Sequence, residues 1–329
     1  MRILTLGLAV LATATAGTDY RISGPYTHSN LSIYLVHSQE RTGGERVYVT
    51  LDEAMEHRLV VVYETSDVNT LLIANVSKEE VYIQSGDIVK GGKQDRVIKE
   101  DMILQSMSGK VPIQVFCVEH GRWTQRGGES AGQFGSSKQA ISGNQMKMAV
   151  RADGNQSAVW DKVAQAQARL SKNLASPVQS AESATSFQLT LESEKLRESA
   201  KAYEAAMSPV VDRYKDAVGY VVAVNGKVTS ADVYANHALF RKLWPKLIAS
   251  AAVEALGADR VAVQAAAPTY DEVKSVVVGG PKDAKAGVTQ QVNARTEVKR
   301  KESAAGVMFE TRDAKGEAGT TVHRSYVAK

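Results

Sequence analysis

The sequence has one cysteine, Cys117, among its 329 residues. A single cysteine cannot form an internal disulfide, so the hydrophobic core must stabilise the fold. A metal site built from several cysteines is likewise excluded, and the six histidines show no spacing typical of metal ligands. We therefore predict no metal site built from cysteine or histidine side chains.

Strong charge of one sign is also missing. Forty basic side chains face thirty-six acidic ones, and no basic tract is present. This balance gives no electrostatic basis for binding nucleic acid or anionic lipid. After the first residues, no stretch is long and apolar enough to cross a bilayer, so we expect no membrane partner once the N-terminal segment is removed.

The first sixteen residues have the pattern of a signal peptide. A positive start at Met1-Arg2 precedes an apolar run over residues 3–12, which is shorter than the roughly 20 residues of a membrane-spanning helix. Ala12, Ala14 and Ala16 provide small-x-small cleavage sites. The sequence thus predicts cleavage of residues 1–16 and a periplasmic or secreted protein.

The mature chain, residues 17–329, is long enough for a single α+β domain. Residues 20–123 form many short strand patterns, which indicates a β-rich sandwich or barrel-like body. Within it, Thr50 and Glu53 form a capping box at the start of a short helix. We expect antiparallel hairpins between residues 71–76 and 81–84, and between 102–105 and 111–118.

Residues 124–155 are rich in Gly, Ser and Gln, which is typical of a flexible linker. The alternative is a mobile flap anchored by Phe134 and Met146. Residues 156–329 are helical and mixed, with helices expected over 157–170, 187–207 and 230–256, the last broken at Pro245. Asn225-Gly226 predicts a type I′ hairpin turn, and alternating patterns after residue 292 predict a final antiparallel set.

The most unusual segment is a charged, glycine-rich loop over residues 84–96. Gly91 and Gly92 allow main-chain N–H groups to point at a bound anion, and Lys93 and Arg96 add positive charge. Gln94 lies among these expected ligand-binding residues. Asp87 and Asp95 are candidate catalytic groups that could orient water or hold a divalent cation. The alternative is a solvated β-turn with charges that pair across the hairpin.

A second group of candidates ends the next strand. Glu119 suits acid–base catalysis if burial raises its pKa, while Arg122 could bind an anion and Trp123 could stack on a base or sugar. Alternatively, Glu119 and Arg122 form a structural ion pair. A lone buried cysteine is most often a small hydrophobe, so Cys117 is a weaker candidate nucleophile.

A third, weaker group surrounds the Asn225-Gly226 turn. Asp232 and Asn236 are four residues apart and would share one face of the expected helix. His237 is a weak candidate ligand.

Four segments together resemble a known family. They are Ile22-Ser-Gly-Pro-Tyr-Thr-His28, Gln84-Ser-Gly-Asp-Ile-Val-Lys-Gly-Gly-Lys-Gln-Asp-Arg96, Phe116-Cys-Val-Glu119 with Gly121-Arg-Trp123, and Asn225-Gly-Lys with Ala231-Asp-Val-Tyr234. They look like the ARG and rhodanese-phosphatase-superfamily-associated domain, over most of the mature chain. The association in this name implies NAD-derived or ADP-ribose-like ligands.

The leading hypothesis is an exported protein that binds a phosphorylated, nucleotide-like or ADP-ribose-like small molecule and acts on it as a hydrolase. The rival is a noncatalytic binding or envelope-interaction module. Catalysis or binding at the loop requires Asp87, Lys93, Arg96 and Glu119 to converge on one cleft. A purely structural role lets them point separately into water.

Overall fold

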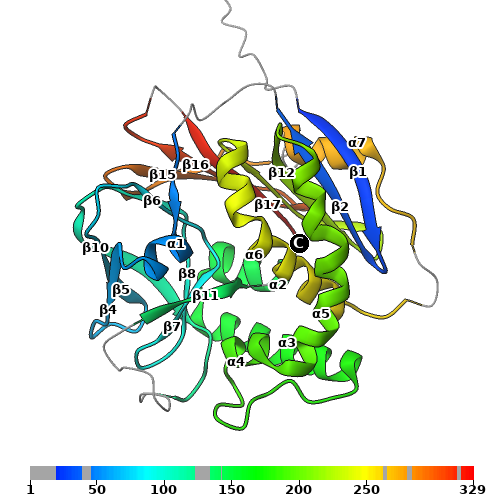
Figure 1. The fold of residues 1–329 in the computed structure, drawn as a ribbon, viewed down its shortest axis with the longest axis horizontal. Helices are drawn as coiled ribbons and strands as arrows, with labels where there is room; N and C mark the ends of the chain where they lie inside the picture. Colours follow the sequence, from blue (N-terminus) through cyan, green and yellow to red (C-terminus); the bar gives the residue numbers. More distant parts are fainter. Residues whose placement is uncertain are drawn as a thin grey trace, which may run out of the picture.

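The computed structural model describes residues 20–38, 46–122, 134–141, 143–261, 265–279, 284–316 and 320–329. The predicted signal peptide lies outside these ranges. The fold is α+β, with a β-rich N-terminal part, helices in the middle and antiparallel strands at the C-terminal end (Figure 1). This confirms the predicted fold class.

The largest sheet has eight antiparallel strands and joins both ends of the described chain. Its order is β1-β2-β12-β13-β17-β16-β15-β14. The strands are β1 (Arg21–His28), β2 (Leu31–His37), β12 (Ala217–Val224), β13 (Lys227–Tyr234), β14 (Val288–Asn293), β15 (Thr296–Glu302), β16 (Gly306–Asp313) and β17 (Thr321–Ala328). The turn between β12 and β13 has φ angles of 51° at Asn225 and 74° at Gly226, as a type I′ turn requires.

The other two sheets form the N-terminal body. The six-stranded sheet has the order β11-β7-β8-β10-β5-β4 and contains β4 (Val60–Tyr63), β5 (Thr70–Asn75), β7 (Asp87–Gly91), β8 (Arg96–Ile98), β10 (Gly109–Cys117) and β11 (Phe134–Ala140). The three-stranded sheet has the order β3-β6-β9, from β3 (Val49–Thr50), β6 (Val81–Ile83) and β9 (Met102–Leu104).

Both hairpins predicted in this part are wrong. Strand β5 pairs with β4 and β10, whereas β6 pairs with β3 and β9. Strands β9 and β10 also belong to different sheets. The strands themselves are near the predicted positions, but β5 does not pair with β6, and β9 does not pair with β10.

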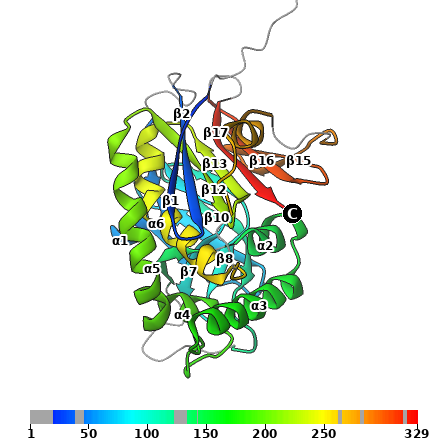
Figure 2. The same cartoon turned by 90° about the vertical axis from the view of Figure 1, so that its right-hand side faces the viewer.

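The helices fill the space beside and between the sheets (Figure 2). They are α1 (Leu51–Glu56), α2 (Asn144–Lys147), α3 (Gln156–Leu174), α4 (Phe187–Glu192), α5 (Glu194–Met207), α6 (His237–Gly257) and α7 (Tyr270–Lys274). Shorter turns are the π-helices η1 (Met148–Asp153) and η3 (Ser275–Gly279) and the 3₁₀-helix η2 (Ser208–Arg213). Helix α6 contacts both β12 and β11 and carries much of the largest hydrophobic cluster.

Three further local expectations can be compared with these elements. The capping box of Thr50 and Glu53 is confirmed. Residues 230–234 are strand, not helix, so Asp232 lies on β13, whereas Asn236 caps α6. Pro245 lies inside α6 and does not end it.

The segment predicted to be a flexible linker forms regular structure where it is described. Residues 134–140 are strand β11, which pairs with β7, and residues 144–153 are α2 and η1. Main-chain pairing needs no apolar side chains, so a Gly- and Ser-rich sequence conceals this strand. Met146 is buried in a core cluster and Phe134 packs against another. None of the described helices is long and apolar enough to span a membrane.

Candidate functional site

The charged loop is the turn of the β7–β8 hairpin, and its main-chain amides contact the chain's own carboxylates. The N–H of Gly91 donates to Oδ1 of Asp95 over 3.0 Å. The N–H of Lys93 donates to Oε1 of Glu64 over 2.9 Å. The amide of Gly91, which we expected to face an anionic ligand, therefore contacts a carboxylate of the chain itself.

Two predicted clusters do converge beneath this turn. Nε of Arg122 donates to Oε2 of Glu119 over 2.8 Å, and Nη2 of Arg122 lies 3.9 Å from Oδ1 of Asp95. Arg96 is buried, with Nη2 3.9 Å from Oε1 of Glu64. Asp95 and Glu119 are both 0% exposed. This group, which we call the hairpin charge cluster, is a packed network of ion pairs.

Gln94 joins the same network, because its Nε2 donates to the main-chain oxygen of Glu119 over 3.2 Å. Lys93 is exposed. Trp123 lies outside the described residues. None of the predicted loop residues lines the pockets of about 400, 450 and 610 Å³ in the described part of the chain. Their catalytic and ligand-binding roles therefore rest on the sequence pattern alone.

Asp87 is not part of the hairpin charge cluster, contrary to the expected convergence. It lies at the start of β7, and its Oδ1 is 2.9 Å from Nζ of Lys246 on α6. Lys246 also lies 2.7 Å from Oδ2 of Asp52. Burial raises the pKa of Asp87, and this ion pair compensates its charge. Asp87 thus ties the six-stranded sheet to α6.

Cys117 has the environment of a core residue. Its side chain is buried, and burial raises the pKa of the thiol. Since the thiolate is the reactive form, this environment opposes nucleophilic chemistry.

A pocket of about 610 Å³ lies elsewhere, between the β8–β9 connection, the end of η1 and the outer strands of the large sheet. Glu100 and Arg151 line it from the first two of these elements, and Val298 and Arg300 line it from β15. We call it the Glu100–Arg151 pocket. Three elements far apart in the sequence therefore form its walls.

Glu100 and Arg151 are the unusual groups of this pocket. They are 7% and 6% exposed, and Oε2 of Glu100 is 3.6 Å from Nε of Arg151. These two atoms face each other as an ion pair, and neither has another hydrogen-bond partner among the described residues. Burial raises the pKa of Glu100, and the charge of Asp101 adds to this effect although Arg151 and Lys99 oppose it. A carboxyl group with a raised pKa in a pocket is a candidate acid–base group.

Asp101 fixes the position of Arg151 through a buried ion pair. Its Oδ2 lies 2.6 Å from Nη2 of Arg151 and also accepts hydrogen bonds from Thr311 and His323. On the other side, the guanidinium of Arg151 lies 4.2 Å from the ring centroid of Phe309. The arginine is therefore fixed by a buried ion pair and by an aromatic face.

The rim of the pocket carries both basic and acidic side chains, with one more basic than acidic residue. Lys99, Lys285 and Arg300 line it together with Arg151, whereas its acidic residues are Glu100, Asp153 and Glu302. Arg151 belongs to the π-helix η1, a rare conformation that often occurs at functional sites. This arrangement suits a ligand with a phosphate or carboxylate group.

Sequence reasoning missed this site. The one local signal of this site was the pair of adjacent acidic residues after β8, Glu100 and Asp101. Arg151 fell in the segment predicted to be flexible. Within the described ranges, no group of three or more His, Cys, Asp or Glu side chains is arranged to hold a metal ion.

Comparison with protein families gives one match. The model of the ARG and Rhodanese-Phosphatase-superfamily-associated Protein domain matches residues 19–327. Searches of curated proteins and of solved structures found no match.

Proposed function

The chain belongs to the ARG and rhodanese-phosphatase-superfamily-associated protein domain family, and from this membership and the Glu100–Arg151 pocket we propose that it binds and hydrolyses a phosphorylated small molecule. The observation that carries the proposal is the buried ion pair of Glu100 and Arg151, with the raised pKa of Glu100, on the wall of a pocket that four basic side chains line. The family name associates the domain with a phosphatase superfamily, which supports phosphate-ester chemistry.

The proposed roles follow from the charges. Lys99, Lys285 and Arg300 bind the phosphate oxygens, and Arg151 stabilises the negative charge that develops during phosphoryl transfer. Water attacks phosphorus as the ester bond breaks, and the water protons stay on the released phosphate, from which one returns to the carboxylate of Glu100. Glu100, which burial keeps protonated to a higher pH than usual, gives its proton to the leaving oxygen. Nucleotides, ADP-ribose and sugar phosphates are the ligand classes to test first.

The test measures release of inorganic phosphate from these compounds, with and without divalent cations, and binding by calorimetry. Glu100→Gln removes the proton but keeps the shape, so turnover should fall by about 100-fold or more while binding remains. Arg151→Lys should weaken both binding and turnover. Lys201→Ala, at an exposed ion pair on α5, is the control and should behave as wild type.

The rival function, a noncatalytic binding module, predicts binding without turnover. Turnover that survives Glu100→Gln would refute the proposed mechanism. If no phosphorylated compound binds or reacts, the proposal itself fails.

We also propose that the protein is exported to the periplasm or beyond. The N-terminal pattern at residues 1–16 supports this proposal. Expression of the full chain followed by N-terminal sequencing should find a mature start after Ala14 or Ala16. An uncleaved chain that remains in the cytoplasm would contradict export.

A further inference from the structure

Three side chains near one edge of the large sheet form a hydrogen-bonded Ser–His–Asp row. Nε2 of His37 lies 2.7 Å from Oγ of Ser23, and Nδ1 of His37 lies 2.9 Å from Oδ1 of Asp216. Ser23 lies on β1, His37 ends β2, and Asp216 immediately precedes β12, which are three neighbouring strands. None of the three lines the Glu100–Arg151 pocket, to which β15 contributes near the other edge of the sheet.

The register of the strands explains why these side chains meet. His37 lies opposite Arg21, and Ser23 is two positions further along β1. Because side chains two positions apart on a strand share a face, Ser23 and His37 are diagonal neighbours on one face of the sheet. On the other side of β2, His37 pairs with Ala217, the first residue of β12. This pairing brings the preceding residue, Asp216, to the imidazole.

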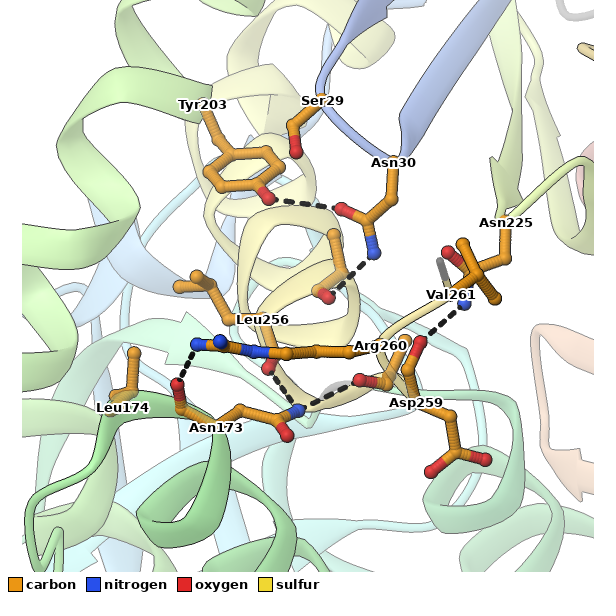
Figure 3. A pocket seen from close by; sticks show the side chains of 12 residues that line it. Ser29, Asn30, Asn173, Leu174, Tyr203, Asn225, Leu256, Asp259, Arg260 and Val261 are labelled. Carbon is orange, nitrogen blue, oxygen red and sulfur yellow. Dashed lines mark hydrogen bonds between the residues drawn. The ribbon is translucent and has the colours of Figure 1, made fainter. Parts of the chain in front are cut away.

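The hairpin that carries Ser23 and His37 is anchored to two helices. In its turn, Asn30 donates to the main-chain oxygen of Ala255 on α6 over 2.9 Å and accepts from the hydroxyl of Tyr203 on α5 over 2.9 Å (Figure 3). These three residues line the pocket of about 400 Å³ at the C-terminal end of α6. Side chains on anchored strands keep a more precise geometry than side chains on mobile loops.

The hydrogen bonds give His37 the protonation state of a general base. An ionised carboxylate only accepts hydrogen bonds, so Nδ1 of His37 donates to Asp216 and Nε2 accepts from the hydroxyl of Ser23. Burial lowers the pKa of His37 from 6.5, although Asp216 opposes this effect. Burial acts to raise the pKa of Asp216, but hydrogen bonds from His37 and Arg21 outweigh it and lower that pKa. Near pH 7, the imidazole is therefore neutral and the carboxylate is ionised.

The surroundings of Ser23 suit attack on a carbonyl group. Ser23 is only half-buried and lies on an outer strand. The hydroxyl of Tyr26 lies 3.3 Å from Oγ of Ser23 and donates to the hydroxyl of Tyr214 over 2.9 Å. Tyr214 packs edge-on against the ring of His37, with 5.1 Å between the centroids. By turning its hydrogen away from Tyr214, Tyr26 can donate to an oxyanion formed on a carbon bonded to Oγ.

We propose that Ser23, His37 and Asp216 form an esterase site that acts on carboxylic esters. Oγ of Ser23 attacks the carbonyl carbon of the ester while its proton passes to Nε2 of His37. The bond from this carbon to the alcohol oxygen then breaks, and His37 gives the proton to that oxygen. Asp216 keeps the imidazole in the correct tautomer, and the hydroxyl of Tyr26 stabilises the oxyanion.

Water completes the reaction at the same atoms. It attacks the acyl carbon and gives a proton to Nε2 of His37. The bond between the acyl carbon and Oγ of Ser23 then breaks, and the proton returns from His37 to Oγ. The products are a carboxylic acid and an alcohol, and the serine hydroxyl is restored. This chemistry is separate from phosphate release at the Glu100–Arg151 pocket.

The test treats the purified protein with a fluorophosphonate probe and with p-nitrophenyl acetate. The probe should attach covalently to Ser23, as peptide mass spectrometry can locate, and the ester should be hydrolysed. Ser23→Ala should abolish the labelling and lower the rate of hydrolysis by about 100-fold or more. Ser32→Ala is the matched control, because this serine lies on the same hairpin and its hydroxyl pairs with Thr27 instead. It should behave as wild type.

Two further variants separate catalysis from a structural role. Asp216→Asn keeps the shape of a side chain that is 40% exposed, and it should lower kcat by about 100-fold or more and slow the labelling of Ser23. Tyr26→Phe should lower kcat by about tenfold or more with little change in KM. Both give a readout if Ser23→Ala does not fold.

The dependence of the wild-type rate on pH is a second readout. Since the base acts as a neutral imidazole with a lowered pKa, the rate should rise with pH through a midpoint below 6.5 and then stay level. The proposal is overturned if the probe leaves Ser23 unlabelled in the native protein. It is also overturned if folded Ser23→Ala hydrolyses the ester as fast as wild type, because the row would then serve only to hold the three strands together.

Discussion

Nδ1 of His323 lies 2.9 Å from Oδ2 of Asp101, and both side chains are buried. The other ring nitrogen, Nε2, lies 3.1 Å from Oδ1 of Asp232. An ionised carboxylate only accepts hydrogen bonds, so both ring nitrogens must carry hydrogen. Burial lowers the pKa of His323, but the two carboxylates outweigh this effect and the net pKa is raised above the ordinary value of 6.5.

The first prediction concerns stability against pH. A histidine whose folded pKa is raised contributes stability that is complete below its unfolded pKa and lost as pH rises through its folded pKa. The wild-type free energy of unfolding should therefore decline above about pH 6.5 through this group. His323→Gln should lose about 3 kcal/mol or more at pH 6 and show a flatter dependence above it.

Urea denaturation at about pH 6 and about pH 9 measures both effects. His57→Gln, at an exposed position, is the control and should change stability by less than about 0.5 kcal/mol. Parallel pH profiles for wild type and His323→Gln would show that the imidazole does not titrate in this range.

The second prediction treats the hairpin charge cluster as structural. Arg122→Met leaves the buried carboxylate of Glu119 without its ion-pair partner and should cost about 3 to 5 kcal/mol. The double variant Glu119→Leu with Arg122→Met removes both charges and should cost less than the single change. Thermal and denaturant unfolding check this order, and Lys93→Ala on the exposed tip should cost under about 0.5 kcal/mol. If the double variant lost more stability than the single variant, the uncompensated charge of Glu119 would not be the main cost of Arg122→Met.

The third prediction compares two glycines with similar backbones. Gly92 and Gly109 have φ angles of 58° and 65°. A Cβ at Gly92 would lie 2.5 Å from Cζ of Phe134 and 2.6 Å from Oε1 of Glu64, whereas a Cβ at Gly109 meets nothing within 4 Å. Both alanine variants should therefore incur the left-handed backbone cost of about 1 to 2 kcal/mol.

Only Gly92→Ala should add a packing cost of about 1 to 3 kcal/mol. Comparison of the two unfolding free energies isolates that steric part. Equal losses would mean that Phe134 and Glu64 move aside freely.

The fourth prediction concerns Cys117. Since its thiol is buried and its pKa is raised, iodoacetamide at about pH 8 should leave it unmodified in the folded protein and alkylate it after unfolding in guanidinium chloride. Intact-mass measurement counts the added groups. Rapid labelling of the native protein would restore Cys117 as a candidate nucleophile.

Local chemistry made some of the fold predictable from the sequence. Thr50 with Glu53, and Asn225 with Gly226, satisfy main-chain groups or special φ angles within a few residues, so their patterns carry the information needed. Several strand positions, such as those of β5 and β6, were also clear from their apolar patterns, whereas β11 and the second half of β13 were missed. Strand partners were not, because pairing depends on which surfaces the whole chain brings together, as the separation of β5 from β6 and of β9 from β10 demonstrates.

The same limit applies to the candidate sites. Asp87, Lys93, Arg96 and Glu119 were expected to converge on one cleft, but Asp87 pairs with Lys246 instead. The ion pair of Glu119 with Arg122 depends on a distance that sequence spacing cannot give. Glu100 and Arg151 are far apart in the sequence and meet because η1 packs against the β8–β9 connection.

The place of β2 between β1 and β12 constrains how the molecule can be made. Residues 21–37 emerge early from the ribosome, yet the strand on which they dock is complete only at Val224. Until then, the two early strands expose an unpaired edge and an uncovered apolar face. The large sheet can therefore assemble only after much of the chain has been made. Until then, β1 and β2 must be kept from pairing with other chains.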